Sequence, residues 1–180
     1  DDWDQPCDPI APRRVVARNP GDPQLLDEIA GVLARASAPA FVLGAGIARD
    51  GAWQEAIALA ERHSAKVWAA PFAAREVFPE RHPLFAGFLN PAREAIVHDL
   101  SGHDLILVVG GPLSLYHTEG FGPHLPEGAQ LYHIVDSIAV ASWAPDGAAV
   151  IADAKSALAR LLGGPAPKAR TRPAGREIPA

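Results

Sequence analysis

The side chains best suited to proton transfer in this sequence are seven histidines, and His117 stands out among them by its position. It follows the apolar run LILVVG (105–110) within the segment GGPLSLYHTEG (110–120). Ligands of open α/β sheets gather where strands end, so a histidine in this segment could exchange protons near neutral pH. An ordinary loop histidine is the alternative, because loops collect polar residues in any protein.

The remaining histidines predict no metal centre. No pair of histidines has the HExxH spacing or another compact ligand pattern. We expect His63 and His98, on helical segments, to be solvated. We expect His133, inside a strand, to be hydrogen-bonded, and His103 to satisfy only the hydrogen-bonding groups of its loop.

No nucleophile motif is present. The sequence lacks GxSxG, the phosphate-binding GxxxxGK[ST], SxxK and the kinase signatures. Ser114 lies near His117 but has no recognisable third partner. Cys7, the single cysteine, lies in a proline-rich segment, so it predicts neither a disulfide framework nor a positioned thiol.

Glycines end two of the apolar runs. Gly44-Ala45-Gly46 stands between a predicted strand and a predicted helix, where a dinucleotide fingerprint would lie, but Arg49 replaces the third glycine. We therefore favour tight turning of the chain as the reason for these glycines, and Gly110-Gly111-Pro112 closes a second strand in the same way. Asp136 could bind a ribose at a strand end, or it could simply form a turn.

Helical periodicity and short apolar runs alternate along the chain. Asp22 and Pro23 predict a capped helix start, and Asn90 with Pro91 repeats that pattern. Strands separated by helices indicate βαβ units and a parallel sheet. We therefore predict a doubly wound, Rossmann-like α/β fold with helices on both faces of the sheet. The helices are expected at 23–37, 51–64, from Asn90 to Leu100, and through Leu162, and the strands at 40–46, 66–71, 105–110, 130–136 and 148–153.

Composition divides the chain into a domain at 22–164, an entering linker at 1–21 and a proline-rich, basic linker at 165–180. The sequence contains no methionine, which indicates a piece of a longer protein. The net charge of −5 argues against nucleic-acid binding and against a polybasic membrane contact. No apolar stretch is long enough to span a bilayer, so we expect a cytoplasmic protein.

Six motifs occur together and in one order along the chain. They are DDWD (1–4), PAFVLGAGI (39–47), KVWAAPFA (66–73), FPERHPLFAG (78–87), GHDLILVVGGPLSLYH (102–117) and VIADAKSALARLL (150–162). With them the sequence resembles the central domain of thiamine-diphosphate-dependent decarboxylases, most closely the benzoylformate decarboxylases. The resemblance extends to about residue 164, and its most specific parts are DDWD, RHPLF and the pair Tyr116-His117.

The resemblance implies a homotetramer whose subunits have three α/β domains. Thiamine diphosphate and Mg²⁺ would be bound by the amino- and carboxyl-terminal domains, and the Gly-Asp-Gly…Asn metal motif is absent from this sequence. The isolated chain is then expected to bind neither group productively and to be inactive. The Tyr116-His117 pair matches a catalytic histidine of the family, so His117 is the implied proton relay.

Two other functions remain open. The domain could bind a flavin or an ADP-like nucleotide, as the central domains of some related enzymes do. It could also be a purely structural central domain in an enzyme resembling acetolactate synthase. The incomplete glycine fingerprint counts against the nucleotide alternative.

Overall fold

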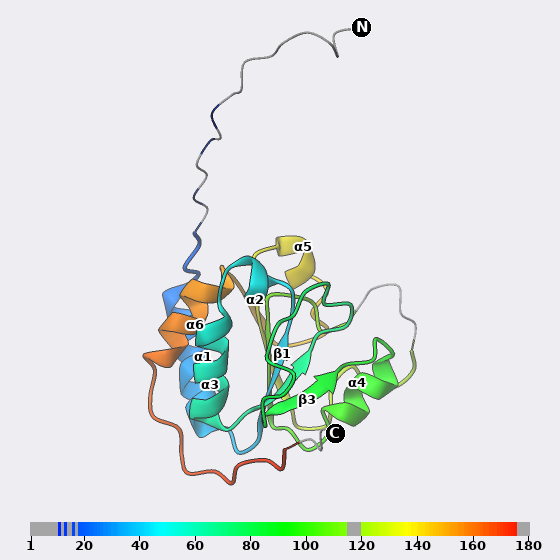
Figure 1. Ribbon diagram of the computed structural model, residues 1–180. Helices are drawn as coiled ribbons and strands as arrows, with labels where there is room; N and C mark the ends of the chain where they lie inside the picture. The colour runs from blue at the N-terminus through cyan, green and yellow to red at the C-terminus, as the bar shows by residue number, and fades with distance from the viewer. Residues whose placement is uncertain (1–10, 12, 14–15, 17, 115–119, 176–180) are drawn as a thin grey trace, which may run out of the picture.

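In the part of the chain that the structure describes, six parallel strands form one sheet in the order β3-β2-β1-β4-β5-β6. The computed structural model describes residues 11, 13, 16, 18–114 and 120–175 (Figure 1). All-parallel pairing with crossover helices confirms the predicted doubly wound, Rossmann-like fold. The strands are β1 (Pro39–Leu43), β2 (Lys66–Ala69), β3 (Phe85–Phe88), β4 (Leu105–Val109), β5 (Gln130–Val135) and β6 (Ala148–Ile151).

Helices cover both faces of the sheet (Figure 1). On one face α6 contacts α1 and α3, and α4 covers the other face. The helices of the described residues are α1 (Pro23–Arg35), α2 (Gly46–Arg49), α3 (Trp53–His63), α4 (Arg93–Asp99), α5 (Ile138–Ala141) and α6 (Ala154–Leu162). None of the helices that the structure describes has the length and apolar character needed to cross a membrane.

The central strands are buried on both faces, as their continuous apolar sequences predict. In β1, Phe41 and Leu43 join the core beneath α1, α3 and α6, whereas Ala40 and Val42 join the core on the opposite face. β4 divides its side chains between the two cores in the same alternating way. Each large apolar side chain removed from water contributes roughly 1.5–3 kcal/mol, so this pair of strands anchors the domain.

Of the two helix starts predicted from capping residues, one is confirmed and the other is wrong. The Asp22 carboxylate accepts a hydrogen bond from Leu25 N at 2.7 Å, which confirms the cap of α1. The predicted start at Asn90 is wrong, because α4 begins at Arg93. The Asn90 side chain instead accepts from Ala92 N at 2.9 Å, which makes a turn two residues before the helix.

Three short elements, β3, α2 and α5, were not predicted from the sequence. Each has only four residues, too few to establish a helical or strand periodicity. β3 is the edge strand next to β2, and its Gly87 adopts a φ of 134°. The register between β2 and β3 also shifts at Val67 and Trp68, so the pairing is irregular there.

The histidine environments correct two predictions. His63 is not solvated: it is only 2% exposed, because the end of α3 is covered by the segment that follows α6. His133 is 1% exposed, but its ring has no hydrogen-bond partner among the described residues. The prediction for His98, which is exposed, is confirmed. So is that for His103, whose Nδ1 lies 2.8 Å from Ala38 O in the loop between α1 and β1.

Burial lowers the pKa of both His63 and His133 to about 4. The unfolded chain takes up these protons near pH 6.5, whereas the folded chain does so only near pH 4. The free energy of unfolding should therefore fall as the pH drops from about 6.5 to 4, by about 1.4 kcal/mol per pH unit for each histidine. Denaturant titrations across that range would measure the slope.

Replacement His133→Leu isolates one of these two contributions, since leucine suits the apolar surroundings and cannot titrate. We expect the slope of stability against pH between 4.5 and 6.5 to fall by about 1.4 kcal/mol per pH unit, the contribution of one buried neutral histidine. His98→Leu, at an exposed position, is the matched control for replacing a histidine by leucine. A His133→Leu protein with the same slope as the wild type would contradict the buried, neutral state of His133.

Candidate functional site

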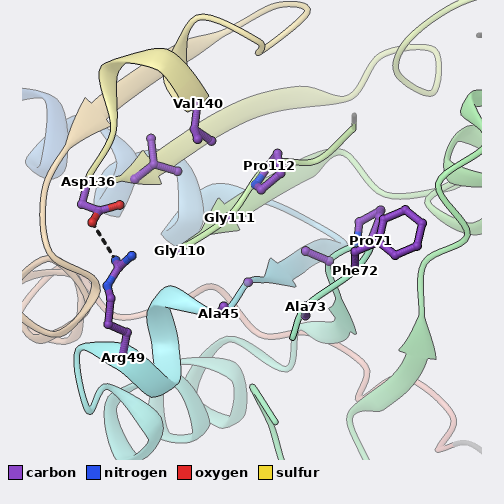
Figure 2. Close-up of a pocket in the computed structure, with 13 residues that line it drawn as sticks. Ala45, Arg49, Pro71, Phe72, Ala73, Gly110, Gly111, Pro112, Asp136 and Val140 are labelled. Atoms are coloured by element: carbon purple, nitrogen blue, oxygen red, sulfur yellow. Dashed lines mark ion pairs between the residues drawn. The ribbon is translucent and has the colours of Figure 1, made fainter. Parts of the chain in front are cut away.

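A pocket of about 190 Å³ opens at the carboxyl ends of the strands, where the strand order reverses between β1 and β4 (Figure 2). Open α/β sheets bind ligands at this switch point, because the loops that follow the two strands diverge there. The lining is mainly apolar and comes from the ends of four strands. It consists of Gly44, Ala45, Arg49, Ala70, Pro71, Phe72, Ala73, Gly110, Gly111, Pro112, Val135, Asp136 and Val140.

The glycines at the base of this pocket bring two loops into backbone contact. A Cβ atom on Gly44 would lie 2.5 Å from the Cα atom of Gly111, and one on Gly46 would lie 2.6 Å from the Cα atom of Gly110. Gly44 N donates to Val109 O and Gly46 N to Gly110 O, both at 2.8 Å. The predicted role in turning is therefore incomplete: neither Gly44 nor Gly46 has a positive φ, and close approach of the loops is what excludes a side chain.

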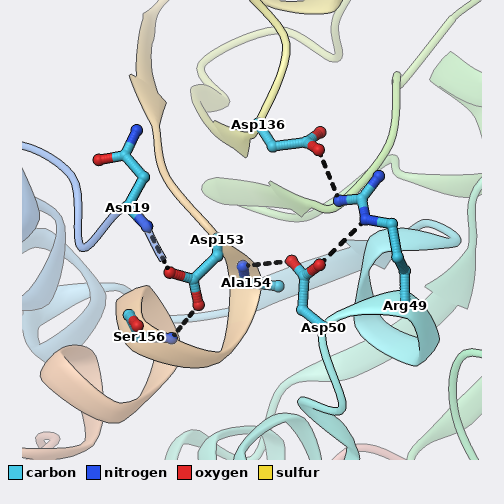
Figure 3. A network of polar contacts seen from close by, with 7 residues as sticks. All are labelled: Asn19, Arg49, Asp50, Asp136, Asp153, Ala154 and Ser156. Carbon is cyan, nitrogen blue, oxygen red and sulfur yellow. Dashed lines mark hydrogen bonds and ion pairs between the residues drawn. The ribbon is translucent and has the colours of Figure 1, made fainter. Parts of the chain in front are cut away.

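Arg49 and Asp136 form an ion pair at one side of the pocket (Figures 2 and 3). Arg49 Nη2 lies 2.9 Å from Asp136 Oδ2, and Arg49 Nε lies 3.0 Å from Asp50 Oδ1. The hydrogen bond to Asp50 is the largest cause of the raised pKa of Arg49. Asp50 is itself fixed, because its other carboxylate oxygen accepts from Ala154 N at 2.8 Å.

The charges of this ion-pair network determine which ligands the pocket favours. One guanidinium faces two carboxylates, so this side of the pocket is net negative and repels an added phosphate. Asp136 was predicted as a ribose ligand or a turn former. In the structure Asp136 lies in a bend directly after β5 and pairs with Arg49, the residue at the place of the missing third glycine.

Phe72 is a pocket residue that the sequence analysis missed. It is 74% exposed and has a φ of 54°, a left-handed conformation that is uncommon for an aromatic residue. The turn closes through a hydrogen bond from Ala73 N to Ala70 O at 3.1 Å. Pro71 was the available signal, since proline favours the second position of such a turn, but phenylalanine does not suggest the third.

Tyr116 and His117 lie outside the described residues, as does Cys7. The chain on both sides of the Tyr-His pair is described. Before it, Gly110, Gly111 and Pro112 line the pocket. After it, Phe121 N donates to Glu94 Oε1 in the first turn of α4 at 2.6 Å, which holds the pKa of Glu94 below its usual range. The stretch that carries His117 thus connects the switch-point pocket to α4.

The described residues contain no group of three or more His, Cys, Asp or Glu side chains that could hold a metal ion. The pocket likewise offers a diphosphate only Arg49, which is already paired with two carboxylates. These residues do not fit a magnesium–diphosphate group.

Comparison with known proteins identifies the family. The family model described as "Thiamine pyrophosphate enzyme, central domain" matches residues 26–161. Over 99% of its length the chain is 39% identical to a benzoylformate decarboxylase from Pseudomonas aeruginosa, and it covers 34% of that protein. It is 31% identical to a sulfoacetaldehyde acetyltransferase from Castellaniella defragrans, over 80% of this chain and 25% of that protein.

A solved structure gives the same result. The crystal structure of benzoylformate decarboxylase from Polynucleobacter necessarius matches 98% of this chain and 33% of its own, with a TM-score of 0.83 and 35% identity. The chain spans about a third of the length of the benzoylformate decarboxylases that it matches. It belongs to the thiamine pyrophosphate enzymes and contains their central domain.

Proposed function

We propose that this chain is the central part of a thiamine-diphosphate- and magnesium-dependent 2-oxo-acid decarboxylase that releases CO₂ and an aldehyde. The observation that carries the proposal is the 39% identity over 99% of the chain to a protein named benzoylformate decarboxylase. The similarity to sulfoacetaldehyde acetyltransferases is weaker and covers less of the chain. An aromatic 2-oxo acid such as benzoylformate is the substrate that follows from this comparison.

The cofactor belongs, in this proposal, to the amino- and carboxyl-terminal domains of a longer chain, in a homotetramer. Thiamine diphosphate supplies the electron sink for loss of CO₂. The described residues contain no group of metal ligands, and the cation that lines the pocket, Arg49, is paired with two carboxylates, which supports this division. The chain by itself is then inactive, and its part in the longer enzyme is a rigid core with one acid–base side chain.

His117 is that acid–base side chain. One of its ring nitrogens would donate a proton to the substrate after CO₂ leaves, and it would accept one when the aldehyde is released. An imidazole serves both directions because its ordinary pKa is near neutrality. Support comes from the boundaries of its loop: Gly110, Gly111 and Pro112 line the switch-point pocket before it, and Phe121 N donates to Glu94 of α4 after it.

Replacing His117 by alanine in the longer enzyme should lower kcat for benzoylformate by about 10²–10⁴-fold, the usual contribution of a positioned acid–base group. The fold should be unaffected, since substitutions in loops are usually tolerated. Steady-state kinetics with the purified enzyme measures the effect. His124→Ala is a matched control, because His124 is an exposed histidine in the same loop, and its kcat should be that of the wild type. Equal rates for the His117→Ala and wild-type enzymes would remove His117 from the mechanism.

Nucleotide binding remains a second candidate because a pocket lies at the switch point beside Gly44 and Gly46. The negative charge around Arg49 opposes it. We expect the 180-residue chain to show no increase in Tm with ADP, FAD or thiamine diphosphate plus Mg²⁺ at millimolar concentrations. A saturable increase with ADP or FAD would favour the nucleotide-binding alternative, and one with thiamine diphosphate would show that this chain holds the cofactor.

A further inference from the structure

The segment that follows α6 is docked on the domain. Arg62 Nη2 in α3 donates to Gly164 O at 2.8 Å and to Pro165 O at 3.2 Å. Further along, Lys168 N donates to Ala34 O at 3.0 Å and Lys168 Nζ to Ser37 Oγ at 2.8 Å. The segment has no helix or strand, as its prolines predict, yet it lies along the ends of α1 and α3. We call residues 164–170 the clasp segment.

Arg170 makes the densest set of contacts in the clasp segment. Its Nη2 donates to Leu33 O at 2.5 Å and to Ala34 O at 3.1 Å, and its Nε donates to Ala36 O at 2.8 Å. Its Nη1 donates to His63 O at 2.7 Å, at the end of α3. The last carbonyls of a helix have no partner within the helix, and a cation there also interacts favourably with the helix dipole. One guanidinium therefore caps α1 and α3 together.

The ring of His63 completes the arrangement. Arg170 Nη1 lies 3.3 Å from His63 Nδ1, and since arginine can only donate, this nitrogen is the acceptor of a neutral ring. The charged groups around the contact are Arg62 in α3 and Arg170 itself, with Asp104 acting on Arg170. Burial and the two arginine charges lower the pKa of His63 to about 4.

The two connections of the domain lie at opposite ends of the sheet. At the carboxyl end of β6, Asn19 N donates to Asp153 Oδ2 at 3.0 Å and Asn19 Nδ2 to Ile151 O at 2.9 Å (Figure 3). The chain that follows the clasp segment instead reaches the far side, where Gly175 lies beside Pro83, just before β3 begins. Figure 1 shows the chain arriving above α6 and leaving below β3.

We propose that Arg170 is the anchor of the clasp segment and fixes the place where the chain leaves the domain, away from the switch-point pocket. Arg62 and Lys168 add hydrogen bonds along the segment, and Arg170 makes most of the contacts that keep it docked. In a longer protein this anchor would set the direction in which the following part begins. The inference stands on the contacts of this chain alone and does not depend on the proposed decarboxylase function.

Hydrogen exchange of the Lys168 amide in the 180-residue chain tests the anchor, because this N–H is bonded to Ala34 O only when the segment is docked. Arg170→Ala should make that amide exchange at least about tenfold faster, since several charge-assisted hydrogen bonds are lost. The pKa of His63, followed by NMR, should rise from about 4 towards 6.5 as the ring loses the nearby charge and its cover. Arg172→Ala, an exposed arginine two residues further on, is the matched control and should change neither.

Arg170→Lys covers the case in which Arg170→Ala does not fold. A lysine keeps the charge but cannot reach four carbonyls at once, so the Lys168 amide should still exchange faster than in the wild type. Wild-type protection in a folded Arg170 variant would overturn the role of Arg170. An unprotected Lys168 amide in the wild type would overturn docking itself. No substrate or cofactor enters these measurements, so their failure would leave the proposed function untouched.

Discussion

The rest of the structure depends on the contact between two glycine loops at the switch point. Gly44 and Gly111 are so close that a single Cβ would have to displace backbone. Overpacking of this kind typically costs about 1–3 kcal/mol, and here it would also push apart the carboxyl ends of β1 and β4. Because these are the two most deeply buried strands, the contact sets the base of the pocket and the direction in which the chain leaves β4.

The ion pairs of Arg49 then fix the loops around that contact. Arg49 is held between Asp50 and Asp136, and Asp50 is bonded to the first residue of α6. The network therefore joins the β1 loop, the β5 loop and the start of α6. Arg49, the cation that lines the pocket, is therefore not free to bind a phosphate.

Local signals were enough to predict most of the fold. The continuous apolar runs predicted β1 and β4, and Asp22 predicted the start of α1. Contacts between distant residues were not predictable in this way. The burial of His63 depends on Arg170, which is 107 positions away in the chain, and nothing in the sequence around His63 reveals it.

The candidate site was predictable to a similar degree. The apolar run before His117 correctly indicated that its loop begins at the carboxyl end of a strand. The ion pair of Arg49 with Asp136 was not foreseen, because it requires knowing that β5 lies beside β4 and that the β1 loop faces both. The left-handed conformation of Phe72 was not predicted either, because phenylalanine is uncommon at that position of a turn.

The central claim is that this domain serves a thiamine-dependent 2-oxo-acid decarboxylase. The most direct test is CO₂ release from benzoylformate by the longer enzyme, measured with and without thiamine diphosphate and Mg²⁺. The account predicts release of CO₂ and benzaldehyde in equal amounts, and only when both are present. An enzyme that is folded and loaded with thiamine diphosphate, yet releases no CO₂ from benzoylformate or any other 2-oxo acid, would contradict it.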